Sequence, residues 1–296
     1  MLATRTATEE LRLHRDRIAL TAFFLLVSLS PLSAHAGNMD GTIDREYPSR
    51  LVTLRHFYSG DYLHFRSDGT VVGDATVGPW TVDGEVEVRD ASLDGGVLTI
   101  KGRRIYQLYN SDLGRFVDAL TTIGNFSGKQ QKDVEKMLRK RQVEIQIDMP
   151  PTPDPREIPE TLHIMFLAPG ESMTAVVASY WHDYFDKLEG KPAKSMPPPG
   201  VVVFKPGVVS APHATFRPDP EYSEDARKLK HQGTLVISLV VDSTGITRDL
   251  QIVRPVGLGL DEKGIAAVSQ WKFQPAEKDG RPVAIAISVE VDFHLY

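Results

Sequence analysis

The chain has 296 residues, of which 41% are hydrophobic and 25% are charged, as is typical of folded domains. This length favours two domains over one. A net charge of −5, without a basic stripe that carries aromatic residues, argues against a nucleic-acid partner. The absence of cysteine excludes disulfides, thiolate metal sites, cysteine nucleophiles and the lipid-modified cysteine of a bacterial lipoprotein.

Residues 1–36 have the layout of a bacterial export signal. Basic residues at positions 12–17 precede the apolar run Ile18–Leu29, and Ala34-His35-Ala36 supplies the small residues of a cleavage site. We expect cleavage after Ala36 and a protein in the periplasm of a Gram-negative-type bacterium. The alternative is an uncleaved inner-membrane anchor, although the apolar run is shorter than the roughly 20 residues that a spanning helix needs.

Residues 38–190 are expected to form a β-rich N-terminal domain of unknown function. Short β-prone runs between residues 51 and 100 are separated by turn signals such as Asp68-Gly69 and Asp94-Gly95-Gly96. Closely spaced strands with turns of this type favour an antiparallel meander of hairpins. The first part of this domain is therefore predicted to be β-rich.

The second part of the N-terminal domain is expected to be α+β. Apolar residues at helical spacing predict helices over Lys129–Gln142 and Thr174–Leu188, whereas Val143–Ile147 and Leu162–Leu167 are predicted strands. The stretch from Lys191 to Pro220 contains eight prolines, which predicts a semi-rigid, extended linker between two domains.

Residues 221–296 begin with a short helix and a hairpin. Ser223 is a suitable N-cap, and acidic residues follow it in the first helical turn. Two alternating segments, Thr234–Asp242 and Ile246–Arg254, flank a turn that ends at Gly245. This pattern predicts an antiparallel hairpin.

A second helix and a last strand complete this module. Leu260–Trp271 has one apolar helical face, and Val283–Phe293 alternates regularly, as a half-buried strand does. The order helix, strand, strand, helix, strand predicts a three-stranded antiparallel sheet whose apolar face two helices cover. The whole chain is therefore expected to be α+β.

These elements carry a motif set that resembles the C-terminal domain of the TonB family, over about a quarter of the chain. The family pattern has a tyrosine before the first helix, a glycine opening the first strand, a glycine in the hairpin turn, Trp-x-Phe-x-Pro-Ala, and Asp-Gly-x-Pro-Val before the last strand. The matching residues are Tyr222, Gly233, Gly245, Trp271, Phe273, Pro275, Asp279 and Gly280. Ser223 replaces the usual proline, and Gly264 is a poor helix former that costs about 1 kcal/mol relative to alanine.

The resemblance implies partner binding through the last strand. In the family, an extended TonB box of an outer-membrane receptor adds to the edge of that strand. The resemblance therefore assigns partner binding to residues of the last strand, namely Val283, Ala284, Ile285, Ala286, Ile287, Ser288, Val289, Glu290 and Val291. An open edge would also permit a strand-swapped homodimer. Trp271 and Phe273 are expected to be core residues rather than ligand contacts.

The resemblance further implies a TonB-like periplasmic protein that binds TonB-dependent outer-membrane receptors or other envelope proteins in energy-coupled transmembrane transport. TonB itself, the energy transducer, keeps an inner-membrane helix that engages ExbB and ExbD, so these would be partners only if this chain stays anchored. The alternative function is a small-ligand or lipid-binding or envelope scaffold protein whose N-terminal domain carries the activity. Gly78-Pro79-Trp80 there is similar to the Gly-x-Trp of lipocalin-like barrels.

No constellation in the sequence predicts catalysis. Gly124–Lys129 resembles a phosphate loop, but its glycines are too close together and Gln130 replaces the required serine or threonine. His182-Asp183 is expected on a helix surface, and the remaining histidines are scattered. We therefore expect a protein that is not an enzyme and has no cofactor, no metal and no nucleic-acid partner.

Overall fold

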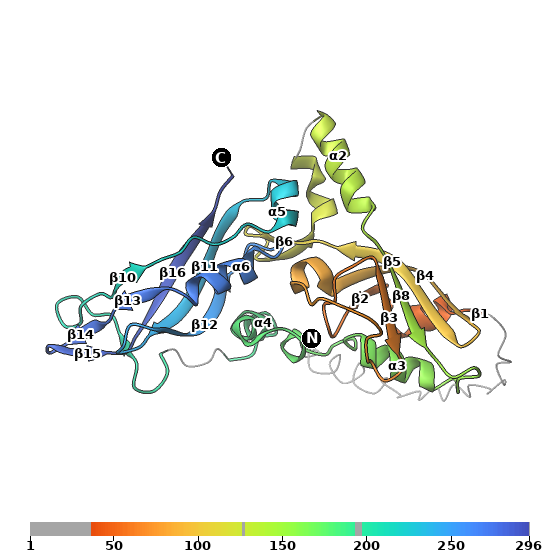
Figure 1. Ribbon diagram of the computed structural model, residues 1–296, viewed down its shortest axis with the longest axis horizontal. Coiled ribbons are helices and arrows are strands. Elements are labelled where there is room, and N and C mark those ends of the chain that lie inside the picture. Colours follow the sequence, from red (N-terminus) through yellow and green to blue (C-terminus); the bar gives the residue numbers. More distant parts are fainter. Residues whose placement is uncertain (1–36, 126–127, 193–196, 296) are drawn as a thin grey trace, which may run out of the picture. The chain divides into compact units, whose positions relative to one another are not determined.

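The computed structural model describes residues 37–125, 128–192 and 197–295 (Figure 1). The predicted export signal, residues 1–36, lies outside these ranges. The described residues pack together as one unit. Within those ranges, none of the helices combines the length and the hydrophobicity needed to cross a bilayer.

A six-stranded mixed sheet forms the N-terminal half, in the order β1-β4-β5-β8-β3, with β2 also paired to β4. The strands are β1 (Gly37–Asn38), β2 (Leu51–Thr53), β3 (Tyr62–Arg66), β4 (Glu85–Asp94), β5 (Val97–Ile105) and β8 (Gln142–Asp148). The β4–β5 hairpin closes through Gly95-Gly96, where both residues have positive φ, as a type I′ turn requires. The turn predicted at this place is therefore present.

The first part of this sheet is not the predicted antiparallel meander. β3 pairs in parallel with β8, which lies far along the sequence. Trp80–Gly84 is a short helical turn rather than a strand, and Val71 makes only an isolated bridge to Phe65. Turn signals report on local chain reversals, whereas a parallel pair needs a long crossover that no local signal encodes.

The described residues before the C-terminal half contain the α-helices α1 (Asp40–Glu46), α2 (Gly128–Arg139), α3 (Glu157–Met165) and α4 (His182–Leu188). The helix predicted over residues 129–142 corresponds to α2, and the strand predicted over residues 143–147 lies within β8. The prediction of a strand over residues 162–167 is wrong, because α3 extends to Met165. Leu162 and Met165 are both buried, three residues apart on one face of that helix. A short apolar run does not distinguish a strand from a buried helix.

A four-stranded sheet forms the C-terminal half, in the order β12-β11-β16-β9. Its elements are β9 (Val202–Val203), α5 (Glu224–Leu229), β11 (Gly233–Val241), β12 (Thr247–Arg254), α6 (Leu260–Val268) and β16 (Ile285–Phe293). The expected order helix, strand, strand, helix, strand is present as α5, β11, β12, α6 and β16 (Figure 1). The three longer strands are antiparallel, and the short β9 adds a parallel edge.

Close packing between α6 and β11 explains the glycine within the second helix. A Cβ atom at Gly264 would lie 2.2 Å from Leu235 Cδ2, which is closer than van der Waals contact allows. Leu235 is fully buried, together with Ile237 and Leu239 on the same face of β11. The intrinsic cost of a helical glycine is therefore offset by the close approach of helix and sheet.

The proline-rich stretch from residue 191 to residue 220 is paired with this half of the protein in two places. β9 pairs with β16, and β10 (His213–Phe216) pairs with β13 (Lys272–Gln274). A further small hairpin joins β14 (Ala276–Lys278) and β15 (Arg281–Val283). Neither β9 nor β10 was expected from the sequence, because proline-rich composition favours an unpaired linker.

Hydrogen bonds tie the start of α6 to the N-terminal half. The N–H of Gly259 donates to Thr81 Oγ1 at 2.9 Å, and the indole N–H of Trp181 donates to Glu262 Oε1 at 3.1 Å. The β6–β7 hairpin (Gln107–Asn110 and Arg115–Asp118) adds backbone bonds, since Leu258 N–H donates to the Gln107 carbonyl at 3.1 Å. The two halves thus share an ordered interface.

A network of buried charges reinforces that interface at α5. Arg104 and Arg141 approach Asp83 Oδ1 at 3.6 and 3.3 Å, and Arg141 also approaches Asp225 of α5 at 3.8 Å. The hydroxyl of Tyr106 donates to Asp225. Burial raises the pKa of Asp83, and the two arginines oppose this shift. Removing Asp83 would take the carboxylate away from the buried Arg104, which costs about 3–5 kcal/mol, whereas removing either arginine leaves Asp83 paired with the other.

Candidate functional site

β16 is the edge at which the C-terminal sheet offers unpaired backbone. On one side it pairs with β11 along its whole length, from Ile285 opposite Val241 to Phe293 opposite Gly233. On the other side β9 covers only Ile285 and Ala286. Beyond Ala286, no strand of the described part of the chain pairs with this outer side. The opposite edge strand, β12, lies against α4.

Two contacts fix which backbone groups of β16 face outward. Val202 N–H donates to the Ala284 carbonyl at 2.9 Å, and the Arg217 guanidinium donates to the Glu290 carbonyl at 3.4 Å. Backbone groups alternate in direction along a strand. The N–H and C=O groups of even-numbered residues such as Ser288 and Glu290 therefore point away from β11, and those of odd-numbered residues such as Ile287 point towards it.

The side chains of β16 anchor the strand at both ends. Ile285, Val291 and Phe293 are buried, whereas Ile287 and Val289 on the same face are only half-buried. On the other face, Ser288 and Glu290 are exposed. The middle of β16 is thus paired with β11 along one edge, and its side chains are half-buried on one face and exposed on the other.

The residues predicted to bind a partner fall into two groups. Ile285, Ala286, Ile287, Ser288, Val289, Glu290 and Val291 all lie in β16. Val283 does not, because it lies in β15 opposite Ala276, and Ala284 lies between the two strands. The predicted continuous strand over residues 283–293 therefore begins at Ile285. The reason is that the β14–β15 hairpin uses Val283 before the chain joins the main sheet.

The motif residues that begin the C-terminal module build its core and its first strand. Tyr222 packs edge-on against Phe293 with ring centroids 5.8 Å apart, and its hydroxyl donates to the His231 carbonyl. Gly233 opens β11, where a Cβ atom would lie 3.0 Å from Val256 Cγ1. Both positions lie at the end of β16, since Tyr222 packs on Phe293 and Gly233 pairs with it.

The hairpin glycine and the motif aromatic residues meet at one point. Gly245 has φ +84°, and a Cβ atom there would lie 1.9 Å from the Phe273 carbonyl oxygen. Phe273 N–H donates to the Gly245 carbonyl at 2.9 Å. Phe273 and Trp271 are both buried, and the Trp271 indole donates to the Pro218 carbonyl at 3.2 Å. Glycine is therefore required sterically at position 245.

The remaining motif residues shape the small β14–β15 hairpin. Asp279 and Gly280 both have positive φ and form its two-residue turn, since Lys278 pairs with Arg281. Pro275 lies between β13 and β14 and is half-buried. Its missing N–H suits a point where one ladder ends and the next begins.

Two adjacent acids at the start of α6, the buried Asp261 and the half-buried Glu262, were missed by the sequence reasoning. Asp261 accepts the N–H groups of Val256 and Gly257 at 2.7 and 2.8 Å. Glu262 Oε1 accepts the Trp181 indole, but its Oε2 is buried without a hydrogen-bond partner among the residues that the structure describes. Burial, followed by the neighbouring Asp261 carboxylate, raises the pKa of Glu262. An acid pair after a glycine is a common helix start, so no sequence signal marks its burial.

The tryptophan of Gly78-Pro79-Trp80 lies in a packed aromatic cluster. Its ring contacts Phe116, Phe185 and Trp181, with centroids 4.7, 5.4 and 5.5 Å away. The sheet beside it contains a parallel pair and is not an up-and-down antiparallel barrel. The tripeptide therefore contributes to the core, and its similarity to a lipocalin motif does not extend to the topology.

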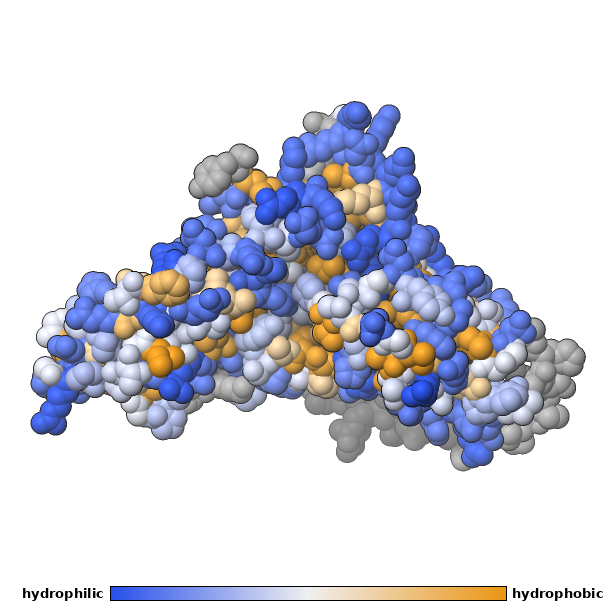
Figure 2. Space-filling model, viewed as in Figure 1, coloured by the Kyte–Doolittle hydropathy of each residue, from blue (hydrophilic) through white to orange (hydrophobic). Residues whose placement is uncertain are grey.

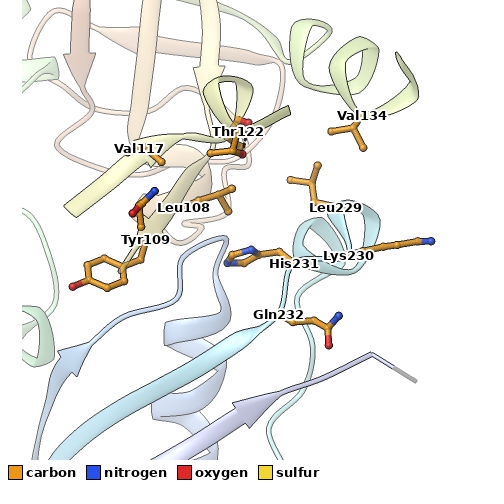
Figure 3. A pocket seen from close by; sticks show the side chains of 11 residues that line it. Leu108, Tyr109, Val117, Thr122, Val134, Leu229, Lys230, His231 and Gln232 are labelled. Carbon is orange, nitrogen blue, oxygen red and sulfur yellow. Dashed lines mark hydrogen bonds between the residues drawn. The ribbon is translucent and has the colours of Figure 1, made fainter. Parts of the chain in front are cut away.

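A cavity of about 210 Å³ lies where the β6–β7 hairpin and α2 meet the segment after α5 (Figure 3). Apolar side chains from both halves line it, including Leu108, Val117 and Leu229, and the ring of His231 faces it while Lys230 extends away. Burial lowers the pKa of His231, whose Nε2 lies 3.1 Å from the Val256 carbonyl oxygen. This lining does not bring an acid and a base together.

The surface offers no single dominant apolar patch on the face that Figure 2 shows. Hydrophobic groups are scattered among hydrophilic ones, both over the C-terminal sheet and over the N-terminal sheet. Exposed apolar side chains include Val203, Phe204 and Phe216.

The family of the C-terminal module is given by a match to a family model. Residues 218–295 match the family model described as "Gram-negative bacterial TonB protein C-terminal". This part of the chain is therefore a TonB-family C-terminal domain.

Two curated relatives match part of the chain. "Protein TonB" of Vibrio cholerae is 34% identical over 96 residues, which is 32% of this chain and 37% of that protein. "Protein tonB2" of Pseudomonas aeruginosa is 30% identical over 79 residues, which is 26% of this chain and 29% of that protein. The match thus spans about a third of the length of these relatives.

A solved structure, the solution structure of the Pseudomonas aeruginosa TonB C-terminal domain, aligns with 16% identity and a TM-score of 0.24. The alignment covers 32% of this chain and 96% of that one.

Proposed function

We propose that this protein is a TonB-like envelope protein that binds extended segments of outer-membrane transport receptors, or of other periplasmic partners, along the outer edge of β16. The observation that carries the proposal is the unpaired backbone beyond Ala286 in a strand that β11 holds along its full length. A partner peptide that adds there gains main-chain hydrogen bonds without any rearrangement of β11.

The chemistry of the edge suits a peptide that is recognised mainly through its backbone. The outward N–H and C=O of Ser288 and the outward N–H of Glu290 supply donors and an acceptor, and the Glu290 carbonyl already accepts from Arg217. The half-buried Ile287 and Val289 supply apolar contact on one side. The exposed Glu290 and Asp292 lie on the other side, where Arg254 approaches the Glu290 carboxylate at 3.8 Å and offsets part of its negative charge. We propose modest sequence selectivity, with a preference for peptides that are neutral or basic opposite these two acids.

The proposal concerns binding and not catalysis. We place the site in the periplasm, as the resemblance and the export signal in residues 1–36 suggest. Energy coupling through ExbB and ExbD would additionally require that the N-terminal segment remains in the inner membrane. Sequencing of the mature N-terminus separates the two cases, because a start at Gly37 indicates a released protein and a start at Met1 an anchored one.

The direct test is a titration of the isotope-labelled full chain with synthetic TonB-box peptides, followed by NMR. We expect amide shifts from Ala286 to Asp292 at peptide concentrations up to the millimolar range. If shifts occur only outside β16, or do not occur at all, the proposed function is rejected.

A further inference from the structure

The segment that precedes the C-terminal domain folds back on the edge of β16. We call residues 202–217 the strap. Its first residues form β9, in which Val202 lies opposite Ile285 and Val203 opposite Ala286 in a parallel pair. Its last residue, Arg217, donates to the Glu290 carbonyl. Both ends of the strap therefore touch the outer side of β16.

The middle of the strap is attached to other strands. Val209 bridges Lys278 of β14, and Ser210 N–H donates to the Glu277 carbonyl at 2.9 Å. β10 then pairs with β13, and the Arg217 guanidinium lies 4.6 Å from the centre of the Trp271 ring. These contacts keep β9 close to β16 even if its own pairing breaks.

β9 itself is held weakly. It is two residues long, and Val203 and Phe204 are 54% and 46% exposed, so they bury little apolar surface against the sheet. Pro206, which follows closely, has no N–H and cannot continue the ladder. A turn closes there, since Val208 and Val209 both donate to the Lys205 carbonyl at 3.0 Å. A two-residue edge strand of this kind opens at low free-energy cost.

We propose that β9 is an internal occupant of the partner-binding edge, and that a partner's extended peptide must displace it to pair with the start of β16. This inference rests on the proposed function. The strap reduces the fraction of molecules whose edge is fully open, which weakens the apparent affinity for any external strand by the same factor. Arg217 adds a second restraint at Glu290, so the freely accessible stretch is centred on Ser288.

The test replaces single backbone donors in the full chain. Val202→Pro removes the N–H that donates to Ala284, whereas Val203→Pro removes an N–H that points away from β16, because directions alternate along β9. The matched pair thus carries the same substitution one residue apart. The probes are a synthetic peptide with the sequence of residues 200–205, GVVVFK, and a TonB-box peptide, each titrated and followed by the amide shifts of residues 284–292.

We expect Val202→Pro to bind the GVVVFK peptide about fivefold more tightly than the wild-type chain does. This factor corresponds to the net contribution of about one backbone hydrogen bond. Val203→Pro should bind like the wild type. Equal affinity of all three proteins for this peptide, or no binding to any of them, overturns the internal-occupant proposal. The TonB-box peptide tests the proposed function separately, because its failure to bind Val202→Pro rejects receptor docking even where GVVVFK binds.

Discussion

The substitution Glu262→Gln tests the buried interface between the two halves of the protein. Gln keeps the oxygen that accepts the Trp181 indole N–H, and it has nearly the same volume. It removes only the ability to ionise. Because burial and Asp261 raise the pKa of Glu262, the folded chain holds this proton more tightly than the unfolded chain does. Wild-type stability therefore falls as the pH rises above the ordinary glutamate pKa.

The magnitude follows from proton linkage. Between the pKa of Glu262 in the unfolded chain and its raised pKa in the folded chain, each pH unit lowers the free energy of unfolding by about 1.4 kcal/mol. Both pH 5 and pH 7 lie in this interval. Raising the pH from 5 to 7 should therefore destabilise the wild type by about 2–3 kcal/mol through this group. Glu262→Gln should not show this pH-dependent loss of stability. Its free energy of unfolding at pH 7 should therefore be higher than that of the wild type. Groups that titrate in the same range without contacting Glu262 cancel in the difference between the two proteins, whereas the neighbouring Asp261, which raises the pKa of Glu262, contributes to that difference.

Urea unfolding at fixed ionic strength, followed by tryptophan fluorescence at pH 5, 6 and 7, measures the effect. A suitable control is Glu221→Gln, which removes an exposed carboxylate paired with Lys263 at 2.6 Å. The pKa of Glu221 is lowered by Lys263, so its loss should give a small effect of opposite sign. Parallel pH profiles for the wild type and Glu262→Gln would refute the buried-acid reasoning.

Two further predictions concern the C-terminal domain. Gly245→Ala should destabilise the fold by at least about 2 kcal/mol in thermal or urea unfolding, because the new Cβ atom would overlap the Phe273 carbonyl. Gly280→Ala is its control, since Gly280 also has positive φ but faces open space and should cost only about 1 kcal/mol. Similar losses at both positions would contradict the steric argument. Ser223→Ala should cost about 1–2 kcal/mol, because the serine hydroxyl caps Ala226 N–H at 3.1 Å and also donates to the Leu258 carbonyl. An unchanged unfolding midpoint would show that this cap does not stabilise α5.

Features that local sequence determines were predictable. Ser223 caps α5, Gly245 lies in the β11–β12 turn, and the apolar alternation of β11 and β16 follows the buried face of the sheet. In each case the residue type and its immediate neighbours fix the conformation. The motif set led to the same region that the family model matches.

Features that depend on distant partners were not predictable. The pairing of β3 with β8 and of β9 with β16 joins segments far apart in the sequence. Val202 and Val203 lie among prolines, so composition alone indicated a linker. The burial of Glu262 depends on Trp181, which comes from the other half of the chain. No local pattern reports such contacts. The last strand was predicted to begin at Val283, whereas β16 begins at Ile285 because Val283 pairs within the β14–β15 hairpin.

The most direct measurement of the proposed function is peptide binding by the full-chain variant Ser288→Pro. Its N–H points outward, so proline there should leave the pairing with β11 intact while removing a donor from the docking edge. Ile287→Pro, one residue earlier, removes a donor that faces β11 and should unfold the domain. We predict that Ser288→Pro keeps its circular dichroism spectrum and loses TonB-box binding. A folded Ser288→Pro protein that binds the peptide with wild-type affinity would contradict docking along β16.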